Sequence, residues 1–209
     1  MRSMPPSPTA YQSENYIFDV IVDMVEPGSR VLDLGCGNGA LLSRLIRERG
    51  VKGMGVDIEE AMVLQCIQKG ISVFQGDLDE GLKDYETGSY DYVILSHTLQ
   101  VVHRPKQLLQ EMIRVGRRVI VNFPNFGYLG VRLKLLFTGR MPETRDLPYK
   151  WYDTPNIHLC TRADFLDLCR ELGIPILKEI TFRRGRILKG PLRNVRSTEA
   201  CYLLKGLTG

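Results

Sequence analysis

The stretch from Val31 to Gly39 reads VLDLGCGNG, an apolar run that leads into three glycines at alternate positions. The pattern predicts a buried strand, a sharp turn and the start of a helix, because glycine permits tight turns and lets a ligand approach the backbone closely. A helix is predicted directly afterwards over Ala40–Arg49, ended by Gly50. In an open α/β sheet, ligands bind at the carboxyl ends of the strands, so this turn is a candidate ligand site.

Outward from this turn, short apolar runs alternate with helical patterns, which is typical of an α/β protein with a mostly parallel sheet. The expected parallel strands are Val31–Leu34, Met54–Asp57, Val73–Gln75, Tyr92–Ser96 and Arg118–Phe123. The expected helices are Tyr16–Val25, Ala40–Arg49, Glu59–Lys69, Pro105–Val115 and a helix from the capping residue Thr161 to Leu172. Two later segments, Ile176–Phe182 and Ala200–Lys205, are expected to form an antiparallel hairpin with a short basic loop. We therefore expect a Rossmann-like, seven-stranded sheet that is mostly parallel and ends in this hairpin.

The chain of 209 residues suits one domain, expected over residues 16–209 after a flexible tail of residues 1–15 that is rich in Pro and Ser. An insertion at about residues 125–160 interrupts the alternation with the amphipathic segment YLGVRLKLLF and several aromatic residues. It is expected to form a lid over the ligand cleft or a contact surface. A small satellite core is the plainer alternative, and a membrane-surface helix is less favoured because the segment is short and modestly basic.

Cysteine and hydropathy patterns limit the classes of protein. Five cysteines, 44% hydrophobic and 25% charged residues suit a globular domain with reduced thiols, and the cysteines lack the paired spacing of a metal site. No apolar run approaches the roughly 20 residues that span a bilayer, and the N-terminus lacks a secretory signal pattern. We therefore expect a cytoplasmic protein with no metal and no membrane association.

Charge is distributed unevenly along the chain. Residues 1–110 hold 10 Lys and Arg against 15 Asp and Glu, whereas residues 111–209 hold 18 against 9. The basic half includes a run without acids: Arg183, Arg184, Arg186, Lys189, Arg193 and Arg196. A solvated loop is its simplest interpretation and an acidic protein partner is the next. Nucleic acid is an unlikely partner, since the run lacks aromatic residues for base stacking.

Acidic residues follow the first three strands. Asp57 ends the second strand, where a carboxylate can hold the two hydroxyls of a ribose, and Asp77 follows the third, where it can accept from the amine of adenine. Together with the glycine turn they define a candidate cofactor site. Its residues are Asp33, Gly35, Cys36, Gly37, Asn38, Gly39, Asp57, Ile58, Asp77, Leu78 and Ser96.

Two cofactors compete for this site. Gly35, Gly37 and Ala40 also satisfy the dinucleotide pattern G-x-G-x-x-A. Asp33, two residues before the first glycine, would face a pyrophosphate with like charge. The same carboxylate suits the ammonium and sulfonium groups of S-adenosylmethionine, which we therefore favour over NAD.

With these motifs in hand, the chain resembles class I S-adenosylmethionine-dependent methyltransferases from about residue 16 onward, and among them the methionine biosynthesis protein MetW family. The segments that carry the resemblance are VLDLGCGNGALL (31–42), GVDI (55–58), FQGDLDEGL (74–82), LSHTLQ (95–100), NFPNFG (122–127) and GRMPETRDLPYKWYDTPNIHLCT (139–161). The last of these is far more specific than the glycine turn.

The resemblance implies S-adenosylmethionine or S-adenosylhomocysteine as ligand and an accessory or regulatory role in methionine biosynthesis, with a MetX-like homoserine O-acyltransferase as partner. It leaves open whether the protein transfers methyl groups at all. The alternative is an active methyltransferase on a small molecule. For that reaction, His97 at the end of the fourth strand is the candidate general base, and otherwise it forms a hydrogen-bonded wall. The oligomeric state is left open.

Overall fold

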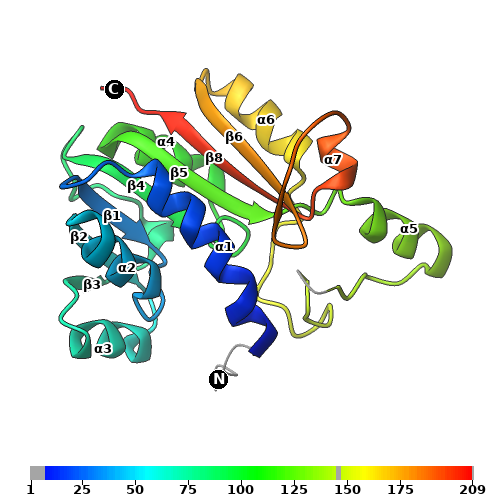
Figure 1. The fold of residues 1–209 in the computed structure, drawn as a ribbon, viewed down its shortest axis with the longest axis horizontal. Helices are drawn as coiled ribbons and strands as arrows, with labels where there is room; N and C mark the ends of the chain where they lie inside the picture. Colours follow the sequence, from blue (N-terminus) through cyan, green and yellow to red (C-terminus); the bar gives the residue numbers. More distant parts are fainter. Residues whose placement is uncertain (1–7, 145–146, 209) are drawn as a thin grey trace.

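The computed structural model describes residues 8–144 and 147–208, with side chains from Tyr16 onward (Figure 1). One sheet runs through the molecule in the order β3-β2-β1-β4-β5-β8-β6-β7. Its strands are β1 (Arg30–Leu34), β2 (Lys52–Asp57), β3 (Val73–Gln75), β4 (Tyr90–Ser96), β5 (Gly116–Pro124), β6 (Ile176–Arg183), β7 (Arg186–Leu188) and β8 (Glu199–Lys205). The strands β3-β2-β1-β4-β5 are parallel, whereas β8 is antiparallel to β5 and to β6. This confirms the expected Rossmann-like, mostly parallel sheet with an antiparallel C-terminal part.

Helices cover both faces of the sheet (Figure 1). They are α1 (Pro8–Met24), α2 (Ala40–Arg49), α3 (Glu60–Gln68), a 3-10 turn (Leu78–Glu80), α4 (Pro105–Val115), α5 (Leu129–Thr138), α6 (Arg162–Glu171) and α7 (Arg193–Arg196). One apolar core contains Ile21 of α1 and Leu42 of α2, and the other contains Leu109 of α4 and Phe165 of α6. Because β5 alternates sides, its Val121 packs in the second core while Ile120 packs in the first.

The N-terminal helix is longer than expected. It begins at Pro8 rather than Tyr16, and a proline is well tolerated in the first helical turn, where its missing N–H is not needed. Residues 1–7 of the expected tail lie outside the described residues. The flexibility of the tail stays a prediction.

The prediction of seven strands, with a short loop joining the last two, was wrong. The dipeptide Arg184-Gly185 has positive φ at both positions, +51° and +79°, which suits a two-residue hairpin turn. It connects β6 to the additional strand β7, with Arg183 opposite Arg186. Both β7 and α7 therefore lie between β6 and β8 in the chain, although β6 and β8 remain antiparallel neighbours.

The expected insertion departs from the sheet after β5. It forms α5, which stands away from the sheet in Figure 1, and the described residues between α5 and α6, 139–144 and 147–161, contain no helix or strand. Only Val131 of α5 is buried. Among the described residues, no helix combines the length and the apolar character needed to cross a bilayer.

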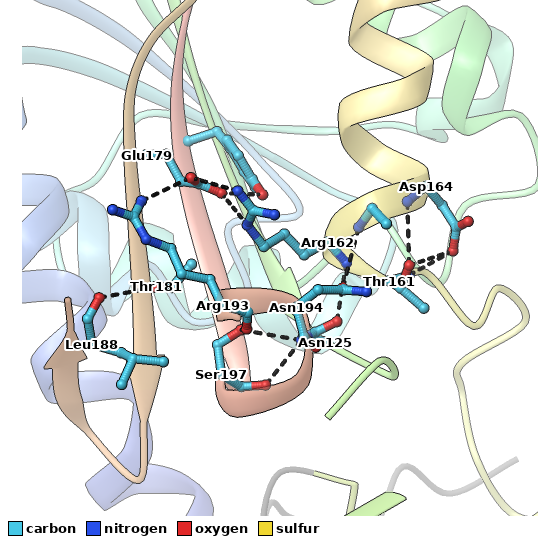
Figure 2. A network of polar contacts seen from close by, with 12 residues as sticks. Asn125, Thr161, Arg162, Asp164, Glu179, Thr181, Leu188, Arg193, Asn194 and Ser197 are labelled. Atoms are coloured by element: carbon cyan, nitrogen blue, oxygen red, sulfur yellow. Dashed lines mark hydrogen bonds and ion pairs between the residues drawn. The ribbon is translucent and has the colours of Figure 1, made fainter. Parts of the chain in front are cut away.

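A polar network joins the two ends of the insertion to the last strands (Figure 2). Asn125, where the insertion begins, accepts hydrogen bonds from the backbone N–H groups of Gly127 and Arg162, both at 3.0 Å. Its side-chain amide donates to the carbonyl oxygens of Ser197, at 2.9 Å, and Asn194, at 2.8 Å. One asparagine therefore fixes the start of the insertion, the start of α6 and the turn before β8.

Glu179 of β6 is the charged centre of the same network (Figure 2). Its two carboxylate oxygens accept from the Arg162 guanidinium at 2.6 and 2.9 Å, and Arg193 and Tyr202 also donate to it, at 3.0 and 2.9 Å. Burial alone would raise the pKa of Glu179, but the hydrogen bonds from Arg162 and Tyr202 and the two positive charges outweigh it and lower the pKa. Arg193 is thus paired, and is not part of a fully solvated basic loop.

We expect Glu179→Gln to lower the free energy of unfolding at pH 7 by roughly 2–4 kcal/mol, because it leaves two guanidinium groups without their counter-charge. Since the pKa of Glu179 is lowered on folding, its contribution is present above the unfolded pKa and is lost as the pH falls through the folded pKa. Urea denaturation at neutral and acidic pH measures both effects. The matched control Asp167→Asn, which breaks an exposed pair with Arg170, should change little. Equal effects of the two substitutions would contradict this account of the network.

Candidate functional site

The glycine turn after β1 is held against the end of β2. The backbone N–H groups of Gly35 and Cys36 both donate to the carbonyl oxygen of Val56, at 2.8 and 3.0 Å. Asp57 accepts from the N–H of Gly37 at 2.7 Å with one carboxylate oxygen and from the N–H of Glu59 at 3.0 Å with the other. The turn and the start of α3 are therefore positioned by one carboxylate.

Two glycines of this turn are required by their surroundings. Gly39 has φ +74°, and a Cβ there would lie 2.6 Å from Cδ1 of Ile71 and 2.9 Å from Sγ of Cys66. Gly35 has φ +67°, and its Cβ would lie 2.5 Å from Oγ1 of Thr98, which follows β4. The turn thus packs tightly on α3 from one side and on the segment after β4 from the other.

Asp33 is the most unusual side chain of the candidate site. It lies in β1 with only 2% of its surface exposed, and within the described part of the chain neither a hydrogen bond nor a cation stabilises its carboxylate. Burial, and secondarily the negative charge of Asp57, raise the pKa of Asp33 to about 7. Ionised Asp33 therefore lacks a cation that would stabilise it.

The remaining candidate residues follow the same edge of the sheet. The Asp77 carboxylate accepts from the N–H of Asp79 at 2.9 Å and caps the 3-10 turn after β3, where Asp77 and Leu78 line a hollow of about 690 Å³. The Asn38 side chain accepts from the N–H of Ala40 at 3.1 Å, so it also positions the start of α2. Ile58 is 61% exposed directly after β2.

Two predicted residues mainly support the turn. Burial raises the pKa of the Cys36 thiol, so this side chain behaves as a small apolar group packed against Gly55. The carbonyl oxygen of Ser96 accepts from the Thr98 hydroxyl at 2.9 Å. Within residues 8–144 and 147–208, no cluster of three or more His, Cys, Asp or Glu side chains could hold a metal ion.

His97 lies in a buried polar cluster that the sequence did not reveal. It has a positive φ of +54°, and its Nε2 lies 3.0 Å from a carboxylate oxygen of Glu199, which is 3% exposed at the start of β8. The Tyr16 hydroxyl and, at 2.9 Å, the Asn122 amide also donate to Glu199. The carboxylate orients the imidazole at the carboxyl end of β4, an arrangement that fits a positioned base as well as a hydrogen-bonded wall.

Gln100 connects this cluster to the insertion. Its side-chain amide donates to the backbone carbonyl oxygen of His97 at 2.6 Å. Its backbone carbonyl oxygen accepts from the N–H groups of Ile157 and His158, at 2.9 and 3.1 Å. In the described part of the chain, the side-chain oxygens of Gln100 and Asn122 are buried without a hydrogen-bond partner. This edge of the sheet therefore holds acceptors for a ligand or for water.

The strand order and the glycine turn define a class, the class I S-adenosylmethionine-dependent methyltransferase fold, and solved structures agree. A methyltransferase from Archaeoglobus fulgidus superimposes with a TM-score of 0.66 at 18% identity, covering 94% of both chains. Magnesium protoporphyrin IX methyltransferase from Synechocystis with bound S-adenosylhomocysteine gives 0.68 at 21% identity, covering 99% of this chain and 90% of that one. At these identities the likeness establishes the fold alone.

The chain belongs to the methionine biosynthesis protein MetW family, whose family model matches residues 16–204. It is 38% identical to a bifunctional methionine biosynthesis protein MetXA/MetW of Rhodopirellula baltica over 77% of this chain but only 27% of that protein. It is 34% identical to a ubiquinone biosynthesis O-methyltransferase of Hahella chejuensis over 73% of this chain and 70% of that protein. The chain thus spans about a quarter of the bifunctional relative.

The packing of the turn predicts unequal effects at two glycines with similar backbone angles. Gly50→Ala adds a Cβ at φ +61° with nothing within 4 Å, so it should cost only the backbone strain of about 1–2 kcal/mol. Gly39→Ala adds the same strain and the close contacts with Ile71 and Cys66, and should destabilise by roughly 1–3 kcal/mol more. Urea denaturation of both variants measures the difference, and equal losses would show that the turn is not tightly packed.

Proposed function

We propose that this protein binds S-adenosylmethionine at the carboxyl ends of β1, β2 and β3. The observation that carries the proposal is Asp33, a buried carboxylate without a counter-charge in the described part of the chain. The ammonium and sulfonium groups of S-adenosylmethionine would stabilise its ionised form, whereas the pyrophosphate of a dinucleotide would repel it. The bound ligand would supply an activated methyl group.

The neighbouring acids suit the rest of this ligand. Asp57 accepts one N–H with each carboxylate oxygen, and every such oxygen has further acceptor capacity that the two hydroxyls of a ribose would use. Asp77 and Leu78 line the hollow after β3, next to the end of β2, because the N–H of Gly76 donates to the carbonyl oxygen of Asp57 at 3.0 Å. That hollow would receive the adenine.

The pKa of about 7 at Asp33 makes binding dependent on pH. A cationic ligand binds the ionised carboxylate, so affinity for S-adenosylmethionine should rise by up to about tenfold per unit as the pH is raised toward 7, and then level. Calorimetric titration between about pH 5.5 and 7.5, in buffers of different ionisation enthalpy, measures the affinity and the proton released.

The control variant Asp33→Asn should bind weakly and without this pH dependence. At about pH 8 its free energy of unfolding should also be higher than that of the wild type, because folding of the variant buries no charge at this position. A wild-type affinity that does not change with pH would contradict a role for the Asp33 carboxylate in binding the cation.

We further propose that the protein is an accessory or regulatory partner of a homoserine O-acyltransferase of the MetX type. The bifunctional relative supports this, since its name joins MetXA and MetW in one chain. Proteins that work together are often found fused, and a site for S-adenosylmethionine, the downstream product of methionine, would allow feedback on the pathway.

A second candidate function is methyl transfer to a small molecule. The observation that favours it is the imidazole of His97, oriented by buried Glu199 at the carboxyl end of β4 beside the glycine turn. A base in this place would accept a proton from an attacking hydroxyl while the methyl group is displaced from sulfur. The similarity to a ubiquinone biosynthesis O-methyltransferase agrees with such chemistry.

One experiment separates the two functions. The homoserine acylation rate of the acyltransferase from the same organism is measured with and without an equimolar amount of this protein. We expect a clear stimulation that S-adenosylmethionine modulates, and no release of S-adenosylhomocysteine. An unchanged acylation rate with both proteins folded, together with release of S-adenosylhomocysteine when a small hydroxylated acceptor is added, would overturn the accessory role and favour methyl transfer.

A further inference from the structure

Exposed apolar side chains gather on the insertion. Of the twenty large apolar side chains that are exposed among the described residues, eleven lie between residues 129 and 159. Leu136 and Phe137 near the end of α5 are 74% and 79% exposed. Where exposed apolar side chains form a contiguous patch, the patch often marks a contact site.

Four exposed apolar residues of α5 form one stripe along the helix, whereas a fifth, Leu135, is 47% exposed on the side of Val131. Leu129, Leu133 and Phe137 follow one another at intervals of four residues, and Leu136 lies beside them, so the four share one side of the helix. Val131, the buried residue of α5, lies on the opposite side. The stripe therefore lies on the exposed side of α5, a helix that stands away from the sheet in Figure 1.

Cations flank the stripe. Arg132 lies at one edge and Lys134 at the other, and both are exposed. Two copies of this chain that met through the stripe would bring these cations together without a compensating acid on α5. The surface is thus complementary to an apolar groove with an acidic rim on a different protein, which is the usual way in which an amphipathic helix is recognised.

We propose that the stripe of α5 docks into such a groove on the homoserine acyltransferase. The inference rests on the accessory role proposed above, and it assigns the surface through which that role is exerted. The matched part of the bifunctional relative makes up only 27% of that protein, so the relative carries a large further portion in the same chain that could provide the groove.

The test compares two double variants of equal chemistry. Leu136→Gln with Phe137→Gln removes the two most exposed side chains of the stripe, and Leu64→Gln with Ile67→Gln changes α3, where the two side chains are 51% and 57% exposed. Glutamine keeps a good helix propensity at all four positions. Binding to the purified acyltransferase is measured by calorimetry and stimulation by the acylation rate, with S-adenosylmethionine affinity and thermal unfolding as controls for folding.

We expect the stripe variant to bind the acyltransferase at least about tenfold more weakly and to stimulate it less at a fixed concentration, with unchanged affinity for S-adenosylmethionine. The α3 variant should behave as the wild type. Lys134→Glu should weaken binding and make it less sensitive to salt, because it removes an attractive charge at the rim.

Contrary outcomes are distinguishable. If the wild type and the stripe variant bind equally well, the stripe is not the docking surface, while the accessory role stands. If the wild type neither binds nor stimulates the acyltransferase, the accessory role fails and this inference with it. Self-association of the wild type in sedimentation, or binding to phosphatidylglycerol vesicles, either one abolished in the stripe variant, would assign the stripe to a second copy or to a membrane and overturn the proposal.

Discussion

The hydrogen bond from the backbone of Gly37 to the Asp57 carboxylate holds the candidate site together. With it, the N–H groups of Gly35 and Cys36 on Val56 fix the turn after β1 to the end of β2 without any ligand. The same arrangement places the Asp57 charge near Asp33 and helps to raise the pKa of Asp33. The contacts that preorganise the turn therefore also place two carboxylates, Asp33 and Asp57, close together, and a cationic ligand would balance their charge.

The parallel half of the sheet could be predicted from sequence because its strands are buried and apolar and are separated by helices with clear ends. α2 and α4 have the predicted bounds, since glycine or proline marks their ends. β7 could not be predicted, because its three residues include an arginine and an exposed isoleucine and it exists only through pairing with β6. Sequence patterns therefore predict the elements that are stabilised by nearby residues, and they miss an element such as β7 that depends on its pairing with another strand.

The residues of the candidate site likewise include some that could be predicted from sequence and some that could not. The acids at strand ends belong to short motifs, so Asp33 and Asp57 could be predicted to lie close together, as they do. The cluster around His97 could not, because its carboxylate, Glu199, is far away in sequence, and Tyr16, which donates to Glu199, is 183 residues from it. Arg193 was likewise counted in a basic run, since its pairing with Glu179 depends on how β6 and α7 lie together.

The segment from His97 to Gln100 contacts both the candidate ligand site and the returning end of the insertion. Thr98 packs on Gly35 of the turn, His97 contacts buried Glu199, and the Gln100 carbonyl oxygen holds the returning end of the insertion. The positive φ of His97 costs of order 1–3 kcal/mol, so this short segment is where a rearrangement would relieve strain. Asn125 joins the start of the insertion to the N–H of Arg162 at the start of α6, so the two ends of the insertion are also tied to each other. A chain of contacts therefore leads from Gly35 of the glycine turn through residues 97–100 to Ile157 and His158 at the end of the insertion.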